Sequence, residues 1–410
     1  MSESHAKRSP DAVVPDPDAQ RALIEEWVRI DSVNPALDPS RDGEGALARR
    51  VRAWGETRGL QTRWIEPVAG RPSVLLRAAG RARGVTSRPG RTLLLNAHLD
   101  TVGVTGMDRP FTPTVADGRL YGRGAMDMKA SLAACLRTAA WAASRSDLSG
   151  DVLVAAVADE EHDSIGTRAV LDAVRSDRDD GSSADLALVT EPTDLELHVA
   201  HRGFALLEAT FHGTASHTSR PADGVNAVAH LGRALVGVEA MDARLRRTAP
   251  HRYVGHGSWQ AVLARGGEEL FTTPARAEAT FERRTVPGES AARDAAAEAE
   301  ALLAELRQHD PTVRAELRAT VVREAFEADL DGPAVRAVER AAGAELGRAP
   351  QRLGAPYWTD AALHEAAGIP TVLFGPVGGG IHRPDEWVDL DSVVRFERVL
   401  RRLVLDLCRA

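Results

Sequence analysis

Two neighbouring glutamates follow an apolar run in the segment "DVLVAAVADEEHDSIG", residues 151–166. If a strand continued through them, Glu160 and Glu161 would point to opposite faces, because side chains alternate along a strand. Both can face one site only where the strand bends; otherwise one of them is a surface residue. Carboxylates at such a position can bind a divalent cation or transfer a proton.

Residue types that bind metals also close the other apolar runs. "TLLLNAHLD" ends in His98 and Asp100, "DLALVTEP" contains Glu191, and "TVLFGP" is followed by a glycine-rich turn and His382. A further candidate is Asp127 in "YGRGAMDMK", where glycines permit a tight turn before a helix. In a parallel α/β sheet the carboxyl ends of the strands meet at one edge, where ligands bind. The sequence therefore predicts that these side chains gather at one site.

The composition of this set predicts a pair of cations. Imidazole and carboxylate groups without a thiolate suit zinc, and Co²⁺ or Mn²⁺ could substitute for it. Five ligands exceed what one catalytic zinc takes, so we expect two Zn²⁺ ions. The expected ligands are Asp127 as the bridge, His98 and Glu191 on one ion, and Glu161 and His382 on the other.

Two acidic residues remain for other roles. Glu160 is predicted to be the general base that takes a proton from a metal-bridging water and passes it to the leaving group. Asp100 lies two residues after His98 and therefore faces the same side of the strand. It is placed to fix the imidazole ring of that histidine.

The elements that must position these residues read as an α/β protein. The chain has 410 residues, 43% of them apolar and 27% charged, which is enough for a sizeable core and favours two domains. Short apolar runs alternate with helical segments such as "MKASLAACLRTAAWAA". This alternation predicts a mostly parallel sheet flanked by helices.

A second, smaller domain is predicted within the first. Between residues 199 and 323 the strands alternate in polarity in a strand-helix-strand-helix-strand order, which suits an α+β domain with one sheet face in water. The predicted boundaries are a disordered tail over 1–18, a catalytic domain over 19–198 and 324–410, and the inserted domain over 199–323.

Charge and cysteine content exclude several classes of partner. The net charge of −8 offers no basic footprint for nucleic acid or an anionic membrane, so small molecules are the expected partners. Only Cys135 and Cys408 occur, which argues against a disulfide framework. The start of the chain does not resemble a signal peptide, and we expect a cytoplasmic protein.

The motifs "HLD", "YGRGAMDMK", "ADEEHDSIG", "TEPT" and "GPVGGGIHRPDEW", in this order, resemble those of the dizinc aminoacylase and carboxypeptidase family. That family includes acetylornithine deacetylase, succinyl-diaminopimelate desuccinylase and glutamate carboxypeptidase. The resemblance spans nearly the whole chain after the tail and implies the same roles for the metal-site residues. It also implies that the inserted domain is a lid and often a dimerisation surface, so a homodimer is expected.

The resemblance implies further roles for residues of the lid. His217, in "GTASHTSRPADGVNA", matches the histidine that stabilises the tetrahedral oxyanion, and Asn226 in the same motif could hold substrate. Arg284, in "FERRTVPGE", matches the arginine that binds the substrate carboxylate, selected over Arg283 by its spacing to the following Pro-Gly. Many relatives carry asparagine where this chain has Phe271.

The expected activity is that of a metal-dependent amidohydrolase. The substrate is an N-acyl amino acid, as for acetylornithine deacetylase, which "YWTDAALHEAAGIP" resembles and in which Asp360 could support the site. A dipeptidase or carboxypeptidase of the same family is the alternative. A non-catalytic metal-binding relative is a second alternative, but it would be expected to have lost the base, and Glu160 is present.

Overall fold

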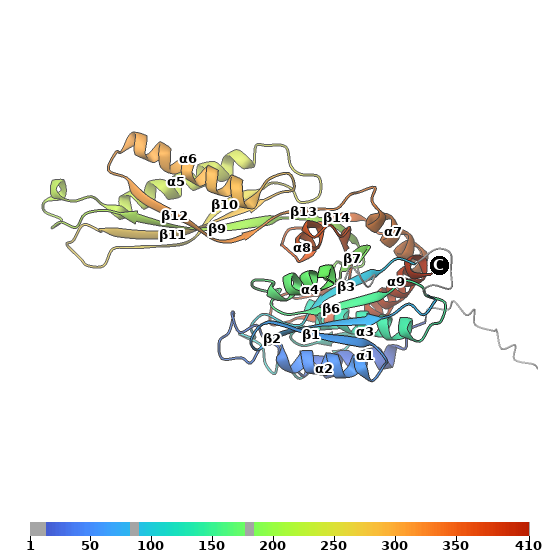
Figure 1. Ribbon diagram of the computed structural model, residues 1–410. Helices are drawn as coiled ribbons and strands as arrows, with labels where there is room; N and C mark the ends of the chain where they lie inside the picture. The colour runs from blue at the N-terminus through green and yellow to red at the C-terminus, as the bar shows by residue number, and fades with distance from the viewer. Residues whose placement is uncertain (1–13, 83–89, 177–183, 410) are drawn as a thin grey trace, which may run out of the picture. The chain divides into compact units, whose positions relative to one another are not determined.

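The computed structural model describes residues 14–82, 90–176 and 184–409 (Figure 1). They form two compact units. The first consists of Met1–His198, Ala328–Arg352 and Thr359–Ala410, and the second of Val199–Glu327 and Leu353–Trp358. The second unit includes residues 353–358, outside the predicted inserted domain. Gly354 accounts for this in part, because it lies so close to the Tyr253 backbone that a Cβ would come within 2.7 Å of the carbonyl oxygen.

The first unit contains most of the helices and the larger sheet. Its helices are α1 (Pro17–Val28), α2 (Gly45–Glu56), α3 (Ala130–Ala143), α4 (Ile165–Ser176), α7 (Pro333–Leu346), α8 (Ala361–Ala366) and α9 (Leu390–Cys408). The large sheet contains β1 (Gln61–Val68), β2 (Arg71–Ala78), β3 (Leu93–His98), β6 (Val152–Val157), β7 (Leu186–Val189), β15 (Thr371–Leu373) and β8 (Leu197–His201). A small sheet contains β4 (Thr114–Ala116), β5 (Arg119–Tyr121), β16 (Gly378–Gly379) and β17 (Trp387–Asp389).

The large sheet has the strand order β1-β2-β6-β3-β7-β15-β8. The central strands β6, β3, β7 and β15 are parallel, whereas β2 and β8 extend the sheet in antiparallel fashion. Strand β8 continues into the second unit, where it pairs with β13 (Phe326–Glu327) and β14 (Arg352–Ala355). The predicted α/β fold with a mostly parallel, helix-flanked sheet is confirmed.

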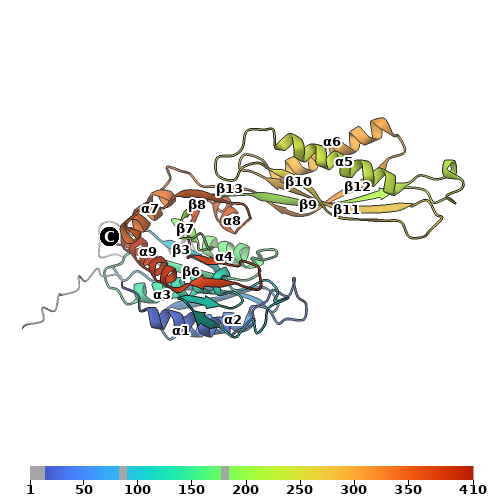
Figure 2. The same ribbon diagram turned by 180° about the vertical axis from the view of Figure 1, so that it is seen from behind.

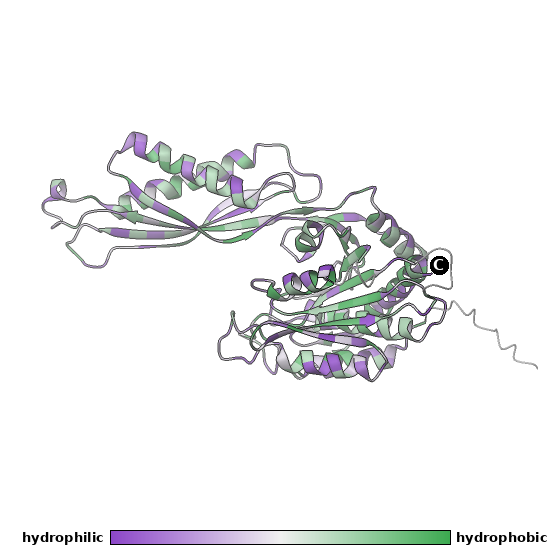
Figure 3. Ribbon diagram, in the orientation of Figure 1, coloured by the Kyte–Doolittle hydropathy of each residue, from purple (hydrophilic) through white to green (hydrophobic). Residues whose placement is uncertain are grey.

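The core lies on both faces of this sheet. All residues of β3, β6, β7 and β15 are buried, which explains why their sequences are mostly apolar and do not alternate in polarity. On one face, Val170 and Leu171 of α4 pack with Leu153 and Leu94 of the strands. On the other, α3 contacts β6 and α9 contacts both α3 and α7 (Figure 2). Figure 3 shows these strands as predominantly hydrophobic.

The second unit is an antiparallel sheet covered by two helices. Its elements are β9 (Gly203–His212), α5 (Ala227–Leu245), β10 (Ser258–Gly266), β11 (Arg276–Thr285), α6 (Ala291–His309) and β12 (Arg314–Arg323). The strand order is β10-β11-β9-β12. Leu207 and Phe281 of the sheet pack with Leu231 of α5 and Leu303 of α6 in one core.

Two sequence-based expectations need correction. Strand β10 was absent from the predicted pattern; most of its residues are exposed at the sheet edge, so they carry no alternation of polarity. Helix α1 begins at Pro17, inside the predicted tail, because the Asp16 carboxylate caps the amides of Asp18 and Ala19 and proline suits the first helical turn. The tail prediction for residues 1–13 lies outside the described residues. No described helix is long and apolar enough to cross a bilayer.

Candidate metal centre

The five predicted metal ligands lie in the first unit, near the carboxyl ends of its central strands. His98 is the last residue of β3, Glu161 follows β6, Glu191 follows β7, Asp127 lies in a tight turn before α3, and His382 lies between β16 and β17. Because β3, β6 and β7 are parallel, their carboxyl ends lie at the same edge of the sheet.

Asp127 stands between the two histidines. Its Oδ1 atom lies 2.9 Å from Nε2 of His98, and its Oδ2 atom lies 3.3 Å from Nε2 of His382. One carboxylate thus offers one oxygen to each imidazole. This is the arrangement that a residue bridging two cations requires.

A second carboxylate accompanies each histidine. Oε1 of Glu191 lies 3.9 Å from Nε2 of His98, and Oε2 of Glu161 lies 3.2 Å from Nε2 of His382. Glu160 belongs to the same site, because it can offer an oxygen within 4.8 Å of ligand atoms of both His98 and Glu191. The structure therefore brings together all five predicted ligands and the predicted base.

The electrostatics of the site favour bound positive charge. Burial and the neighbouring Glu191 raise the pKa of Glu160, and burial and Asp127 raise that of Glu191. Hydrogen bonds to Asp127 and Glu161 raise the pKa of His382 to about 10. For His98, burial disfavours the charged ring, but Asp127 and nearby acidic groups outweigh it and raise the pKa. In the metal-free protein, protons on His98 and His382 therefore provide the positive charge that bound cations would otherwise provide.

The residues present fit two divalent cations. Oε1 of Glu161 is buried and has no hydrogen-bond partner among the described residues, so one ligand atom is left for an ion. The donors are imidazole nitrogens and carboxylate oxygens, a set that suits zinc and similar ions. Nδ1 of His98 lies 2.9 Å from the backbone oxygen of Asp100, which holds the proton on Nδ1 and directs Nε2 towards Asp127.

Asp100 contacts the ring of His98 through its backbone rather than through its side chain. Its carboxylate is 3.7 Å from Nδ1 of His98, whereas its backbone oxygen makes the close contact with the ring. The carboxylate instead accepts the backbone N–H groups of Glu160 and Glu161, each at 3.1 Å. The alternation of side chains along a strand places Asp100 on the same side as His98, but it does not determine whether the backbone or the side chain of Asp100 meets the ring.

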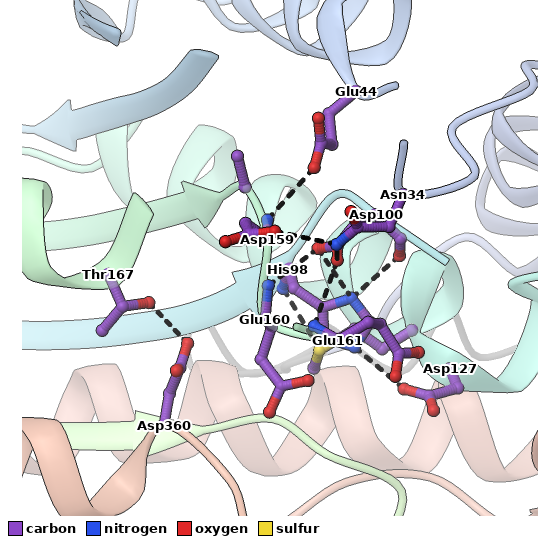
Figure 4. Close-up of polar contacts among 12 residues, drawn as sticks. Asn34, Glu44, His98, Asp100, Asp127, Asp159, Glu160, Glu161, Thr167 and Asp360 are labelled. Atoms are coloured by element: carbon purple, nitrogen blue, oxygen red, sulfur yellow. Dashed lines mark hydrogen bonds and ion pairs between the residues drawn. The ribbon is translucent and has the colours of Figure 1, made fainter. Parts of the chain in front are cut away.

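The chain bends where the two glutamates require it. Strand β6 ends at Val157, and Asp159 has a φ of +69°, in the left-handed region that non-glycine residues rarely adopt. Glu160 and Glu161 therefore leave the strand in a turn, with their backbones held by Asp100 (Figure 4). Of the two sequence-based alternatives, the structure has the bend, and both glutamates reach the site.

Glu386 is a site residue that the sequence analysis missed. It is buried, and its carboxylate accepts the backbone N–H groups of Gly124, Met126 and Asp127 at 2.9–3.1 Å. It also binds the buried guanidinium of Arg123. Glu386 thereby ties the turn that carries Asp127 to the segment that carries His382. Glu386 lies four residues after His382 in the motif "HRPDEW", and this proximity in the sequence could have indicated its role.

Asp360 lies near the site but forms no hydrogen bond or ion pair with any of the five predicted metal-binding residues. Its buried carboxylate accepts Thr167 Oγ1 at 2.5 Å and Asn96 Nδ2 at 3.3 Å (Figure 4). Although it immediately precedes α8, its side chain makes no capping bond there. It therefore links β3, two residues before His98, to α4 and α8.

Comparison with known proteins shows the family. Residues 94–406 match the model described as "Peptidase family M20/M25/M40". This chain belongs to that family. It is 30% identical to a succinyl-diaminopimelate desuccinylase of Cereibacter sphaeroides over 94% of this chain and 98% of the relative. It is 29% identical to an acetylornithine deacetylase of Myxococcus xanthus over 72% and 74% of the two chains.

Solved structures of other proteins share the fold. An aminopeptidase PepT from Bacillus cereus superposes with a TM-score of 0.77 at 16% identity, covering 97% of this chain and 100% of that one. The YXEP protein of Bacillus subtilis, described as a dinuclear metal-binding peptidase of the M20 family, gives 0.69 at 17% identity, covering 96% and 99%. The predictions of the family and of a hydrolase acting on amide bonds are confirmed.

The three predicted site residues His217, Asn226 and Arg284 of this M20 protein lie in the second unit, as does Phe271. His217 is exposed, and its Nδ1 accepts the backbone N–H of Ser219, so the ring proton is on Nε2. Asn226 caps α5, with its Oδ1 accepting the amide of Ala229. Phe271 is 73% exposed at a positive φ.

The two adjacent arginines of β11 have different environments. Arg283 is fully buried and forms ion pairs with Glu298 at 2.9 Å and Glu289 at 3.1 Å. Arg284 is partly exposed, stacks on Phe204 and pairs with Glu282. Arg284 is thus the one that can reach a ligand, whereas Arg283 is used within the fold.

Proposed function

We propose that this M20 hydrolase is a dizinc deacylase that removes the acyl group from an N-acyl amino acid. The observation that carries the proposal is the position of Asp127 between His98 and His382, with Glu160 beside them. The similarity to relatives named as a deacetylase and a desuccinylase supports an acyl substrate rather than a long peptide.

The residues that would hold the ions divide into two groups around Asp127. His98 and Glu191 would hold one ion, and Glu161 and His382 the other, with Asp127 shared. When bound, such cations act as Lewis acids that polarise an amide carbonyl and lower the pKa of water.

Glu160 moves the proton in this proposal. Its carboxylate oxygen lies within 4.8 Å of ligand atoms of His98 and Glu191, which places it to exchange a proton with a water at the ions. Its carboxylate accepts a proton from the attacking water and delivers it to the nitrogen of the leaving amine. The Asp100 carboxylate holds the backbone of Glu160 while this occurs.

Two residues of the second unit complete the proposed mechanism. The Nε2–H of His217 donates to the oxyanion of the tetrahedral intermediate, a contribution typically worth roughly 3–4 kcal/mol. Arg284 binds the substrate carboxylate, for which its planar guanidinium is suited. Asn226 contributes through its amide nitrogen, since its oxygen caps α5. A homodimer formed through the second unit is also part of the proposal.

The test is amine release from a panel of N-acetyl, N-succinyl and N-formyl amino acids and dipeptides by the zinc-loaded protein. Glu160→Ala is the control, because it removes the base while leaving all five ligands. Activity on one acyl group that disappears in the variant is the expected result. Turnover of dipeptides alone would replace the deacylase with a dipeptidase. No turnover with two zinc ions bound would favour a non-catalytic relative.

A further inference from the structure

A buried polar cluster lies behind the turn that carries Glu160 and Glu161. It comprises Asn34, Glu44, Arg71 and Asp159, which we call the Arg71 cluster. Nη2 of Arg71 lies 2.6 Å from Glu44 Oε1 and 2.8 Å from Asp159 Oδ1, and it donates to Asn34 Oδ1 at 3.1 Å. Glu44, Asn34 and Asp159 are all at least 98% buried, so these contacts are shielded from solvent.

The cluster holds Asp159 from several sides. Arg71 and the Asn34 amide both donate to Oδ1 of Asp159, and Oε1 of Glu44 accepts the Asp159 backbone N–H at 3.1 Å. Asp159 is the residue with a φ of +69°. Such a conformation costs free energy and persists only where the surroundings determine it. The contacts with Asn34, Glu44 and Arg71 supply that constraint.

The cluster also reaches the glutamates through Asp100. The Nδ2 atom of Asn34 donates to Asp100 Oδ2 at 2.8 Å as well as to Asp159 Oδ1 at 3.0 Å (Figure 4). The Asp100 carboxylate in turn accepts the N–H groups of Glu160 and Glu161. One amide group therefore links the start of the turn to the carboxylate that holds its next two residues.

Arg71 is the positive centre of this arrangement. Burial disfavours its charge, but the hydrogen bonds and attraction from Glu44 and Asp159 outweigh burial and raise its pKa, so it stays protonated. Without it, two buried carboxylates would face each other unpaired, which is strongly unfavourable. A lysine could not donate to Glu44, Asn34 and Asp159 with the same planar geometry.

We propose that Arg71, with Asn34 and Glu44, is a positioning device that sets the turn bearing both the proposed base and one metal ligand. This inference deepens the proposed function and rests on it for the role of Glu160. None of the three residues is a ligand or a base; they act through Asp159 and Asp100. All three lie outside the sequence motifs that carry the chemistry, so their types and spacing alone do not mark them.

The proposal predicts an unequal effect on the two ions. The Arg71 cluster is hydrogen-bonded to the turn of Glu161 and to Asp100, but among the described residues it forms no hydrogen bond or ion pair with Glu191 or His382. Weakening it should lower affinity for the ion held by Glu161 and His382, and leave the ion of His98 and Glu191 close to its original affinity. Displacement of Glu160, the proposed base, should lower kcat with little change in KM.

The experiment compares Arg71→Gln and Arg71→Lys with Arg77→Gln. Arg77 is the matched control, because it lies on the same strand, β2, and pairs with the buried Asp151 at 2.7 Å. Zinc binding is measured by competition with a chromophoric chelator, fitted to two sites, together with thermal unfolding of the metal-free protein. The steady-state parameters kcat and KM are measured on the substrate found for the wild type.

The expected result is a loss of roughly 10–100-fold in affinity for one ion and in kcat for Arg71→Gln, as is typical when a group that orients a ligand is removed. Arg71→Lys should recover part of both, and Arg77→Gln should bind two ions like the wild type. Equal weakening of both ions, or an equal effect in Arg77→Gln, would overturn the proposal. Unchanged metal binding and kcat in Arg71→Gln would also overturn it.

A replacement variant and a measurement without substrate keep the proposal testable. If Arg71→Gln does not fold, Asn34→Ala takes its place, because it removes the link between Asp159 and Asp100 without unpairing a buried charge. Selective loss of one ion in Asn34→Ala would support the proposal, and wild-type zinc binding would overturn it. The zinc titration requires no substrate, so a failure of the proposed deacylase activity leaves the positioning test intact.

Discussion

Nδ1 of His98 lies 2.9 Å from the backbone oxygen of Asp100 and 3.7 Å from its carboxylate. Asp100 therefore serves two neighbours with two different groups: its backbone orients the imidazole, and its side chain holds the turn of Glu160 and Glu161. Substitutions of the side chain should affect the turn and spare the ring.

Asp100→Asn tests this division. The amide keeps one acceptor oxygen but presents an NH₂ group to the second of the two N–H donors, so the turn should loosen. We expect kcat to fall by roughly 10–100-fold and the ion of Glu161 and His382 to bind more weakly. A zinc titration fitted to two sites measures the weaker binding, and steady-state kinetics measure the fall in kcat. Selective loss of the ion held by His98 would show instead that the carboxylate orients the ring.

Asp127→Ala should affect both ions at once. Asp127 offers a separate oxygen to each histidine, so its removal takes a ligand from both positions. The loss should exceed the roughly 10–100-fold typical of an orienting residue. The number of zinc ions that the variant retains after dialysis is measured by atomic emission. Asp108→Ala, at an exposed residue, is the control and should retain two ions. A variant that kept one ion tightly bound would contradict the bridging role.

Metal binding should strengthen as pH rises. In the metal-free protein the pKa of His382 is raised to about 10 and that of His98 is also raised, so both rings are protonated at neutral pH. Cations bind the unprotonated rings and must displace these protons. We expect proton release on zinc binding and an apparent affinity that increases from pH 6 to 8. Calorimetry in buffers of different ionisation enthalpy measures the number released. Binding without proton release would contradict the raised pKa values.

His364 should make the protein sensitive to acid. It is fully buried, neither ring nitrogen has a hydrogen-bond partner among the described residues, and burial lowers its pKa to about 4. The unfolded chain takes up the proton near pH 6.5, whereas the folded chain does not until about 4. Stability is therefore present above 6.5 and is lost as the pH falls towards 4.

His364→Leu should remove this loss. Between pH 7 and 4, the free energy of unfolding should fall by roughly 3 kcal/mol more in the wild type than in the variant. Urea unfolding at several pH values measures the difference. His309→Leu, at an exposed position near the end of α6, should follow the wild type. Parallel pH curves for wild type and His364→Leu would show that the histidine is not responsible.

The adjacent arginines of β11 should separate stability from substrate binding. Arg283→Gln removes the buried partner of Glu298 and Glu289, which are themselves partly exposed, and should destabilise the second unit by roughly 1–3 kcal/mol. Arg284→Gln should change stability by less than about 1 kcal/mol but raise KM for substrates with a free carboxylate. Thermal unfolding of both variants tests the effect on stability, and their KM values test the effect on substrate binding. An unchanged KM in Arg284→Gln would remove its proposed role.

Much of the fold and of the proposed ligand set could be read from local sequence. Mostly apolar runs marked β3, β6, β7 and β15, because strands covered on both faces have no reason to alternate in polarity. Parallel strands share one edge for their carboxyl ends, so His98, Glu161 and Glu191 could be placed together. Strand β10 escaped prediction because an exposed edge strand lacks such a pattern.

The sequence by itself determined which chemical groups are present and at which strand ends they stand. Only the tertiary structure decided how those groups are held. It made the side chain of Asp100 hold a turn while its backbone holds the ring of His98, brought Glu386 into contact with the turn of Asp127, and brought Arg71 to Asp159, 88 residues away in the chain. Such contacts join distant segments through single side chains and leave no local periodicity, so they become visible only when the chain is folded.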